Sequence, residues 1–265
     1  MNITHAIPGT AAMHQNELLS ALLANVRNRA ARHLALIDLP FGAVLNQTDS
    51  CAYFPNDALV SLQSVIENGK SVEIGMVGSE GLIGIDGMIG GRYPYIQAKV
   101  QCAGTAFRVP NRLLRREFNR HVDLRWMILR YLHSMISQIG QAATCYRHHS
   151  IEQQLCRKLL MSSDRLCSDE LVLTQTTIAD LLGVRREGVT AAAVELRKLG
   201  VIDYYRGHIR ILDRAKLEER SCECWAVLQA QCHQFRPSDS RAATIWADFA
   251  STKQAAVRRQ MQAPA

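Results

Sequence analysis

Residues 173–202, with the sequence LTQTTIADLLGVRREGVTAAAVELRKLGVI, decide the fold of this chain. The first part places apolar residues at helical spacing and stops at Gly183, a residue that accepts the left-handed backbone angles of a helix end. From Arg185 to Lys198 a second amphipathic period follows, with Val189 placed to fill the space between the two helices. Two short helices that meet at such a tight corner predict a helix-turn-helix, whose second helix enters the major groove of DNA.

The first turn of the second predicted helix carries side chains that can recognise base pairs. Arg186 can bond O6 and N7 of guanine together, and Glu187 can accept a hydrogen bond from N4 of cytosine. The alternative is an ordinary helical hairpin with a solvated Arg-Arg-Glu turn, which this turn alone does not exclude.

Residues 201–212 weaken that alternative, because they predict two short strands around a turn at Arg206 and Gly207. A hairpin directly after the second helix is a wing, and its basic side chains are placed to meet DNA phosphates. The predicted DNA contacts of the helices and the wing are Gln175, Thr176, Arg185, Arg186, Glu187, Thr190, Arg206, His208 and Arg210.

The composition is that of an ordinary globular protein large enough for two domains. The chain has 265 residues, of which 48% are hydrophobic and 21% charged. Its net charge of +7 favours a polyanionic partner without proving one. The sequence has no glycine-rich phosphate loop, zinc-protease helix or nucleophile elbow, so we expect no enzymatic activity and no catalytic residues.

The N-terminus and the cysteines indicate the compartment. The first residues lack the basic region, apolar core and cleavage site of a secretory signal, and no apolar run is long enough to cross a bilayer. Eight cysteines at irregular spacing fit reduced thiols rather than a disulfide framework. We therefore expect a cytoplasmic protein without membrane contact.

Ahead of the helix-turn-helix, short β-strands follow a helical N-terminal segment. Residues 16–36 predict one or two helices, which Pro40 and Gly42 end. Strands separated by turn residues are then typical of a sandwich or β-roll, and Asn68-Gly69 indicates a hairpin. The expected fold class is therefore α+β. The predicted strands cover residues 43–45, 51–54, 58–66, 71–77, 95–101 and 105–109.

A short helix over residues 111–119 and a long one over residues 122–146 are predicted to follow. In the long helix, apolar residues alternate at intervals of four and three, which is the seam of a coiled coil. This pattern predicts a homodimer, and the alternative is a single buried helix without a dimer. The predicted dimer interface consists of Ile128, Leu132, Met135, Ile139, Ala142 and Tyr146.

Residues 183–190, GVRREGVT, together with the Leu-x-x-x-Gly-Val-Ile ending and the wing, resemble the DNA-binding domain of the Crp/Fnr family of bacterial transcription regulators. The resemblance implies that Arg186 and Glu187 contact bases and that the long helix pairs two subunits. The implied partners are double-stranded DNA, at a palindromic site, and RNA polymerase for an activator. A family position that often holds arginine is Ala191 here. A small-molecule-binding module with vestigial DNA binding is therefore the second hypothesis.

The family's N-terminal domain is a β-roll built like a cyclic-nucleotide-binding domain, in which a Gly-Glu pair binds the ribose and an Arg-Ser-Ala segment binds the phosphate. This chain has Gly84-Ile85 and Arg92-Tyr93-Pro94 at those places. Isoleucine accepts no hydrogen bond, and proline has no backbone N–H to donate. We expect a ligand-free scaffold or a pocket for an unidentified effector around Gly84, Arg92 and Tyr93, with no bound cyclic AMP or other cofactor.

Residues 215–231 predict a helix with Cys222 and Cys224, and Cys232 and His233 follow it. Positions two apart on a helix point to nearly opposite sides, so Cys222 and Cys224 can converge on one metal only if the helix breaks there. We therefore expect no metal site and interpret these cysteines as reduced, packed thiols.

His148 and His149 lie in a polar junction between domains, where adjacent histidines are expected to be solvated rather than bound to metal. The predicted domains are a β-roll sensor with its leading helix over residues 1–118, a dimerisation helix over 119–147, a winged helix-turn-helix over 148–220 and a helical C-terminal extension over 221–265.

Overall fold

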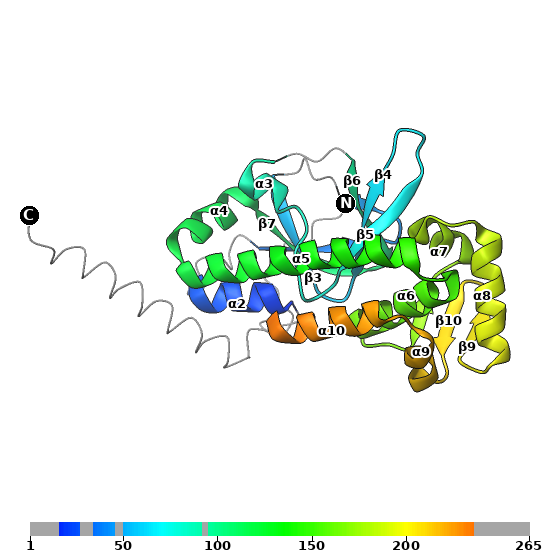
Figure 1. The fold of residues 1–265 in the computed structure, drawn as a ribbon. Coiled ribbons are helices and arrows are strands. Elements are labelled where there is room, and N and C mark those ends of the chain that lie inside the picture. The colour runs from blue at the N-terminus through cyan, green and yellow to red at the C-terminus, as the bar shows by residue number, and fades with distance from the viewer. Residues whose placement is uncertain (1–15, 27–33, 46–49, 92–94, 236–265) are drawn as a thin grey trace, which may run out of the picture.

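The computed structural model describes residues 16–26, 34–45, 50–91 and 95–235, and Figure 1 shows their arrangement. A β-domain lies behind the long helix α5, and a domain of short helices and strands lies at the C-terminal end of that helix. The fold is α+β, as the sequence predicts. The part of the C-terminal extension after residue 235 lies outside the described residues.

The N-terminal domain is a β-roll of two antiparallel sheets with strand orders β1-β7-β3 and β2-β6-β4-β5. Its core contains the fully buried aromatic side chains of Tyr53, Phe54 and Phe107. All six predicted strands are present to within one residue, and the predicted Asn68-Gly69 hairpin joins β4 to β5. The strands are β1 (Ala35–Leu39), β2 (Val44–Leu45), β3 (Cys51–Pro55), β4 (Leu59–Val65), β5 (Ser71–Val77), β6 (Ile96–Cys102) and β7 (Gly104–Pro110).

Of the one or two helices expected over residues 16–36, the structure describes α2 (Glu17–Val26), and residues 27–33 lie outside the described residues. The chain is already extended in β1 from Ala35. In β1, Ile37 and Leu39 are buried while Asp38 between them is exposed, because pairing with β7 turns alternate side chains to opposite faces. This strand was not predicted, because the leucines before it continue a helical period. The short helix α3 (Asp86–Ile89) was not predicted either.

Two helices follow the β-roll as predicted, α4 (Asn111–Arg120) and α5 (Val122–His148). One face of α5 packs on the β-roll, where Leu124 and Ile128 are completely buried and Tyr131 donates a hydrogen bond to the carbonyl oxygen of Leu82 at 2.6 Å. Among the helices that the structure describes, none is both long and apolar enough to cross a membrane.

The C-terminal domain has its own core, built around Leu159 of its first helix and Leu196 of the helix-turn-helix. Ser150 caps the first helix, and its hydroxyl accepts a hydrogen bond from the backbone N–H of Gln153. The elements of this domain are α6 (Ile151–Leu166), β8 (Glu170–Val172), α7 (Gln175–Leu182), α8 (Arg186–Lys198), β9 (Ile202–Tyr205), β10 (His208–Ile211), α9 (Arg214–Arg220) and α10 (Glu223–Phe235).

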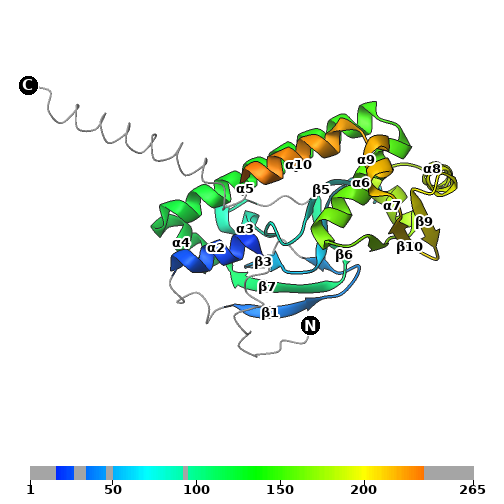
Figure 2. The ribbon, with the colours of Figure 1, turned by 90° about the horizontal axis from the view of Figure 1, so that it is seen from below.

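The single helix predicted over residues 215–231 is wrong, because the chain breaks into α9 and α10 at Ser221, which has extended backbone. The break has a packing reason. Leu217 of α9 belongs to the core of the C-terminal domain, whereas Leu228 of α10 packs with Leu59 of the β-roll. One straight helix does not serve both cores, and after the break α10 runs beside α5 (Figures 1 and 2).

A buried ion pair joins the C-terminal domain to the β-roll. Lys158 of α6 is only 1% exposed, and its ammonium group donates to both carboxylate oxygens of Glu73 at 2.8 Å. Gln101 completes the network, because its Oε1 accepts from Lys158 at 2.9 Å and its Nε2 donates to Glu73 at 2.9 Å. Burial lowers the pKa of Lys158, an effect that Glu73 opposes. The neighbouring carboxylate of Glu73 therefore favours the charged form of the buried Lys158 side chain.

We predict that Lys158→Met lowers the free energy of unfolding by about 3–5 kcal/mol, because Glu73 is left as an unpaired buried charge. Adding Glu73→Gln should recover a large part of that loss, since the remaining amides can bond to each other. Denaturant unfolding measures both effects. Lys216→Met is the matched control, because Lys216 is exposed and pairs only at the surface with Asp213. Equal destabilisation by Lys158→Met and Lys216→Met would contradict the prediction.

Candidate nucleic-acid interface

The predicted helix-turn-helix is formed by α7 and α8. Thr174 caps α7, because its hydroxyl accepts the backbone N–H of Thr177 at 3.0 Å, and the helix ends at Gly183 in left-handed backbone. In α8, Val189 and Leu196 are completely buried against the domain core. The packing predicted from the sequence is therefore confirmed.

Gly188 lies where α8 approaches the start of α6. A Cβ atom at this position would lie 2.6 Å from Cδ1 of Ile151, so a larger residue would require at least the end of that side chain to move. Ile151 is the first residue of α6, directly after the junction with α5. The start of the second helix thus packs beside the domain junction.

The first turn of α8 presents its charged side chains to solvent. Arg185, Arg186 and Glu187 are all exposed, and among the described residues none of the three forms an ion pair. These side chains lie in the first turn of the second helix, as the sequence predicts, and they are accessible to a ligand.

Thr190 and Gln175 lie differently from the first-turn residues. The Thr190 hydroxyl donates to Oε1 of Gln175 at 2.8 Å and lies 3.0 Å from the carbonyl oxygen of Arg186. This bond ties α8 to the start of α7. The backbone N–H of Gln175 donates to the phenol oxygen of Tyr204 at 3.1 Å, a wing contact that the sequence analysis missed. Thr176, the other residue predicted on α7, is exposed beside it.

The wing follows as predicted. β9 and β10 pair antiparallel, with β8 on the other side of β10, and the turn residues Arg206 and Gly207 both have positive φ angles, 48° and 85°. Arg206 projects from this turn, with its guanidinium carbon 5.0 Å from the centre of the Tyr205 ring. His208 is exposed.

Arg210 is the least available of the three basic wing residues. Its guanidinium bonds the carboxylate of Glu170 on the neighbouring strand β8 through two nitrogens. Both side chains are mostly exposed, so the pair contributes little stability and a phosphate can compete for the arginine.

Residues 153–220 match a family model, that of the Crp-like helix-turn-helix domain. This part of the chain belongs to that family. It runs from the first turn of α6 to the end of α9, and so includes the whole helix-turn-helix and wing. The resemblance stated for residues 183–190 and the wing is confirmed.

Solved structures extend the likeness to the whole fold. A Crp/Fnr-family regulator from Eubacterium rectale is 15% identical, with a TM-score of 0.58, and the match covers 76% of this chain and 93% of that one. FixK2 from Bradyrhizobium japonicum is 13% identical with a TM-score of 0.60, over 71% and 98% of the chains. A Crp/Fnr-family regulator from Thermus thermophilus is 20% identical with a TM-score of 0.56, over 70% and 97%. The chain therefore has the Crp/Fnr fold. A sequence comparison with curated proteins gives no match.

Gly84 and Ile85, the residues predicted at the cyclic-nucleotide cassette, lie next to β3 and the core of the β-roll. Gly84 has a φ of 85°, and a Cβ atom there would lie 2.7 Å from the carbonyl oxygen of Cys51, so this glycine is explained by its close approach to β3. The next residue, Ile85, packs against an apolar cluster of the β-roll. Arg92 and Tyr93, the other predicted pocket residues, lie outside the described residues.

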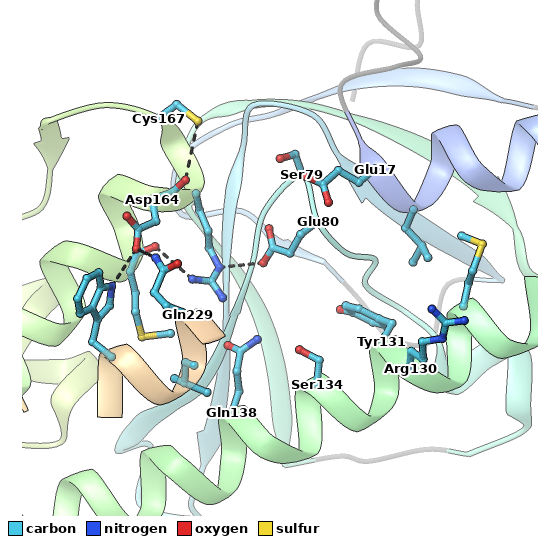
Figure 3. A pocket seen from close by; sticks show the side chains of 16 residues that line it. Glu17, Ser79, Glu80, Arg130, Tyr131, Ser134, Gln138, Asp164, Cys167 and Gln229 are labelled. Atoms are coloured by element: carbon cyan, nitrogen blue, oxygen red, sulfur yellow. Dashed lines mark hydrogen bonds and ion pairs between the residues drawn. The ribbon is translucent and has the colours of Figure 1, made fainter. Parts of the chain in front are cut away.

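A different cavity, of about 210 Å³, lies between α2, α5, α6 and α10. Figure 3 shows Glu80 on one side of it and the hydrogen bond between Asp164 and Gln229 on another. The carboxylate of Glu80 forms an ion pair with Arg165. Tyr131 lines it as well, and burial raises the pKa of that phenol. This cavity is not predictable from the sequence, because its walls come from the four helices and the loop that holds Ser79 and Glu80, which share no motif.

The exposed face of α5 is not the predicted seam. Ile128, Met135 and Ala142 of that seam are buried within the chain, and Tyr146 donates a hydrogen bond to the carbonyl oxygen of Glu73. These residues pack on the β-roll and are not available to a second subunit. Leu132 also packs on the β-roll core, and only Ile139 is exposed. A second set of residues, offset by one position from the repeat of the predicted seam, has the same spacing of four and three and is exposed. This set consists of Val122, Trp126, Leu129, His133, Ile136, Gly140 and Ala143.

Proposed function

We propose that this chain is a dimeric, sequence-specific DNA-binding transcription regulator that acts on a palindromic operator. The observation that carries the proposal is the exposed first turn of α8, where Arg186 and Glu187 lie ahead of the buried Val189 and form no ion pair with any residue that the structure describes. In a helix-turn-helix these positions face base edges in the major groove, and the wing meets the backbone beside them. The Crp-like family of the domain supports the same assignment.

The second subunit is assigned to the exposed face of α5. Leu129 and Ile136 are 40% and 68% exposed, which is high for large aliphatic side chains on a helix that is otherwise packed. Their spacing continues through Gly140 and Ala143, so a second α5 can approach along the whole seam. Two copies related by a two-fold axis would place two α8 helices in successive major grooves, with half-site centres about one helical turn apart.

The β-roll is proposed to work without cyclic AMP. The side chain at the ribose position, Ile85, is part of an apolar cluster and offers no hydrogen-bond acceptor. The role left to the β-roll is to hold α5 and α6 and, through them, to set the orientation of the two DNA-binding domains.

We predict that selection from a random DNA pool yields a palindrome with a G·C pair under Arg186. Arg186→Ala should cost about 1–3 kcal/mol in operator binding and relax the preference at that pair, whereas Arg206→Ala should weaken binding to all sequences and flatten its salt dependence. Arg197→Ala, at the far end of α8, removes the same charge as a control. If the selection enriched no sequence, the result would favour the alternative of a small-molecule-binding module with vestigial DNA binding. If Arg186→Ala weakened binding to operator and random DNA equally, Arg186 would be a phosphate contact.

We predict that the chain sediments as a dimer and that Ile136→Asp together with Leu129→Asp converts it to a monomer, because the two charges would be buried in the seam. Ile66→Asp is the control, since Ile66 is 55% exposed and lies on the β4–β5 hairpin away from α5. Circular dichroism should show both variants folded. A dimer that survives the double substitution would place the interface elsewhere.

We predict that calorimetry detects no tight binding of cyclic AMP to the full chain. The loss of a ribose hydrogen bond alone costs about 1–3 kcal/mol, and the proline at position 94 removes a further donor. Ile85→Glu, which restores the carboxylate, is the informative companion variant. A low-micromolar dissociation constant for the unaltered chain would overturn the assignment of the cassette.

A further inference from the structure

Four potential metal ligands converge where α5 meets α10. Cys145 and His149 lie one helical turn apart at the end of α5, and Cys222 and Cys224 flank the first residue of α10. Their ligand atoms, three sulfurs and one imidazole nitrogen, all lie within 4.8 Å of one another. The break at Ser221 is what makes this possible, because it takes Cys222 out of the helix and lets it turn toward Cys224. The expectation of no metal site rested on one continuous helix over residues 215–231, and the structure has two helices there.

The separations match those around one tetrahedral ion. The sulfurs of Cys145 and Cys222 are 3.6 Å apart, and the Cys224 sulfur is 3.4 Å from Nδ1 of His149. A zinc ion at about 2.3 Å from sulfur and about 2.0 Å from nitrogen keeps its tetrahedral ligand atoms about 3.5 to 3.8 Å apart. A multi-iron cluster holds its cysteine sulfurs further apart than these atoms lie, so the geometry fits a single ion.

The three sulfurs are buried, and the histidine is held by a neighbouring carboxylate. Cys145 and Cys224 are completely buried, and Cys222 is 4% exposed. Nε2 of His149, the nitrogen facing away from the sulfurs, lies 3.3 Å from the Glu223 carboxylate. A carboxylate on the second nitrogen is the arrangement that orients a metal-bound histidine and fixes its tautomer.

Two further contacts favour thiolates at this place. The side-chain amide of Gln141 donates to the Cys224 sulfur at 3.0 Å. Arg157 of α6 is buried and interacts electrostatically with Cys145 and Cys222, and no carboxylate among the described residues forms an ion pair with it. Three thiolates and a neutral imidazole around Zn²⁺ leave one net negative charge, which this guanidinium balances.

We propose that Cys145, His149, Cys222 and Cys224 bind one zinc ion in a closed, structural Cys₃His site. Three sulfurs and one nitrogen in a tetrahedron are a ligand set that selects zinc among the common divalent metals. Binding releases the thiol protons to solvent and forms three Zn–S bonds and one Zn–N bond, with no change of oxidation state. The ion would link the end of α5, which precedes the helix-turn-helix domain in the chain, to the start of α10, which follows it.

The test uses the full chain, produced with added zinc and purified without chelator. Elemental analysis should find about one zinc ion per chain, and Cys222→Ser with Cys224→Ser should lose it. Cys167→Ser is the control for the loss of a thiol, because Cys167 is an exposed free cysteine outside the cluster. Cys232 and His233, whose side chains lie outside the described part of the chain, remain in every variant.

Cobalt exchange keeps the proposal testable if the double variant fails to fold. The unaltered chain, stripped of zinc and loaded with Co²⁺, should show the strong visible bands of a tetrahedral ion and a sulfur-to-cobalt charge-transfer band, which His149→Ala should shift. Substoichiometric zinc without a cobalt spectrum would overturn the proposal. So would zinc that is retained by the double variant, or a Cys145–Cys222 disulfide in protein kept anaerobic and zinc-replete.

Discussion

The buried contact between Lys158 and Glu73 governs the relation between the two halves of the molecule. Lys158 belongs to α6, and Glu73 belongs to β5 in the β-roll, 85 positions earlier in the chain. Removing either partner while the other stays buried would cost several kcal/mol, so the packing of the two domains at this point requires both residues. The same helix begins at Ile151, which lies beside Gly188 in the first turn of α8. The β-roll also contacts α7, whose C-terminal Gly183 lies next to Val72 of β5, so it meets the helix-turn-helix through α6 and α7 together.

The long helix α5 explains both a success and an error of sequence-based prediction. Its length, its boundaries and its four-and-three spacing follow from the sequence, since they depend on local periodicity. The choice of face does not, because Ile128 and Leu129 are both apolar and each begins a repeat of the same spacing. Only the presence of the β-roll decides that Ile128 is buried and that Leu129 faces outward. Likewise, the helix-turn-helix and the wing were predictable because Gly183 and Gly207 mark their corners locally.

The features that escaped prediction depend on contacts between distant segments. Cys145 and Cys222 lie 77 positions apart, and nothing local to either residue indicates the other. The decisive break at Ser221 is set by competition between two cores, not by a proline or glycine in the sequence. β1 was missed for a related reason, because its pairing with β7 outweighs the helical period of the residues before it. Tertiary packing thus decided each case in which the local pattern allowed more than one structure.

The junction between α5 and α6 carries two restraints of different chemical character. The Lys158–Glu73 pair is sealed by burial, so its strength depends little on the solution outside. A zinc ion held by Cys145, His149, Cys222 and Cys224 would instead depend on free zinc and on the redox state of three thiols, because only thiolates bind the metal. Its loss would release α10 from the end of α5 while leaving α6 anchored. The contact between α5 and α10 would thus respond to metal and redox conditions, whereas the contact between α6 and the β-roll would not.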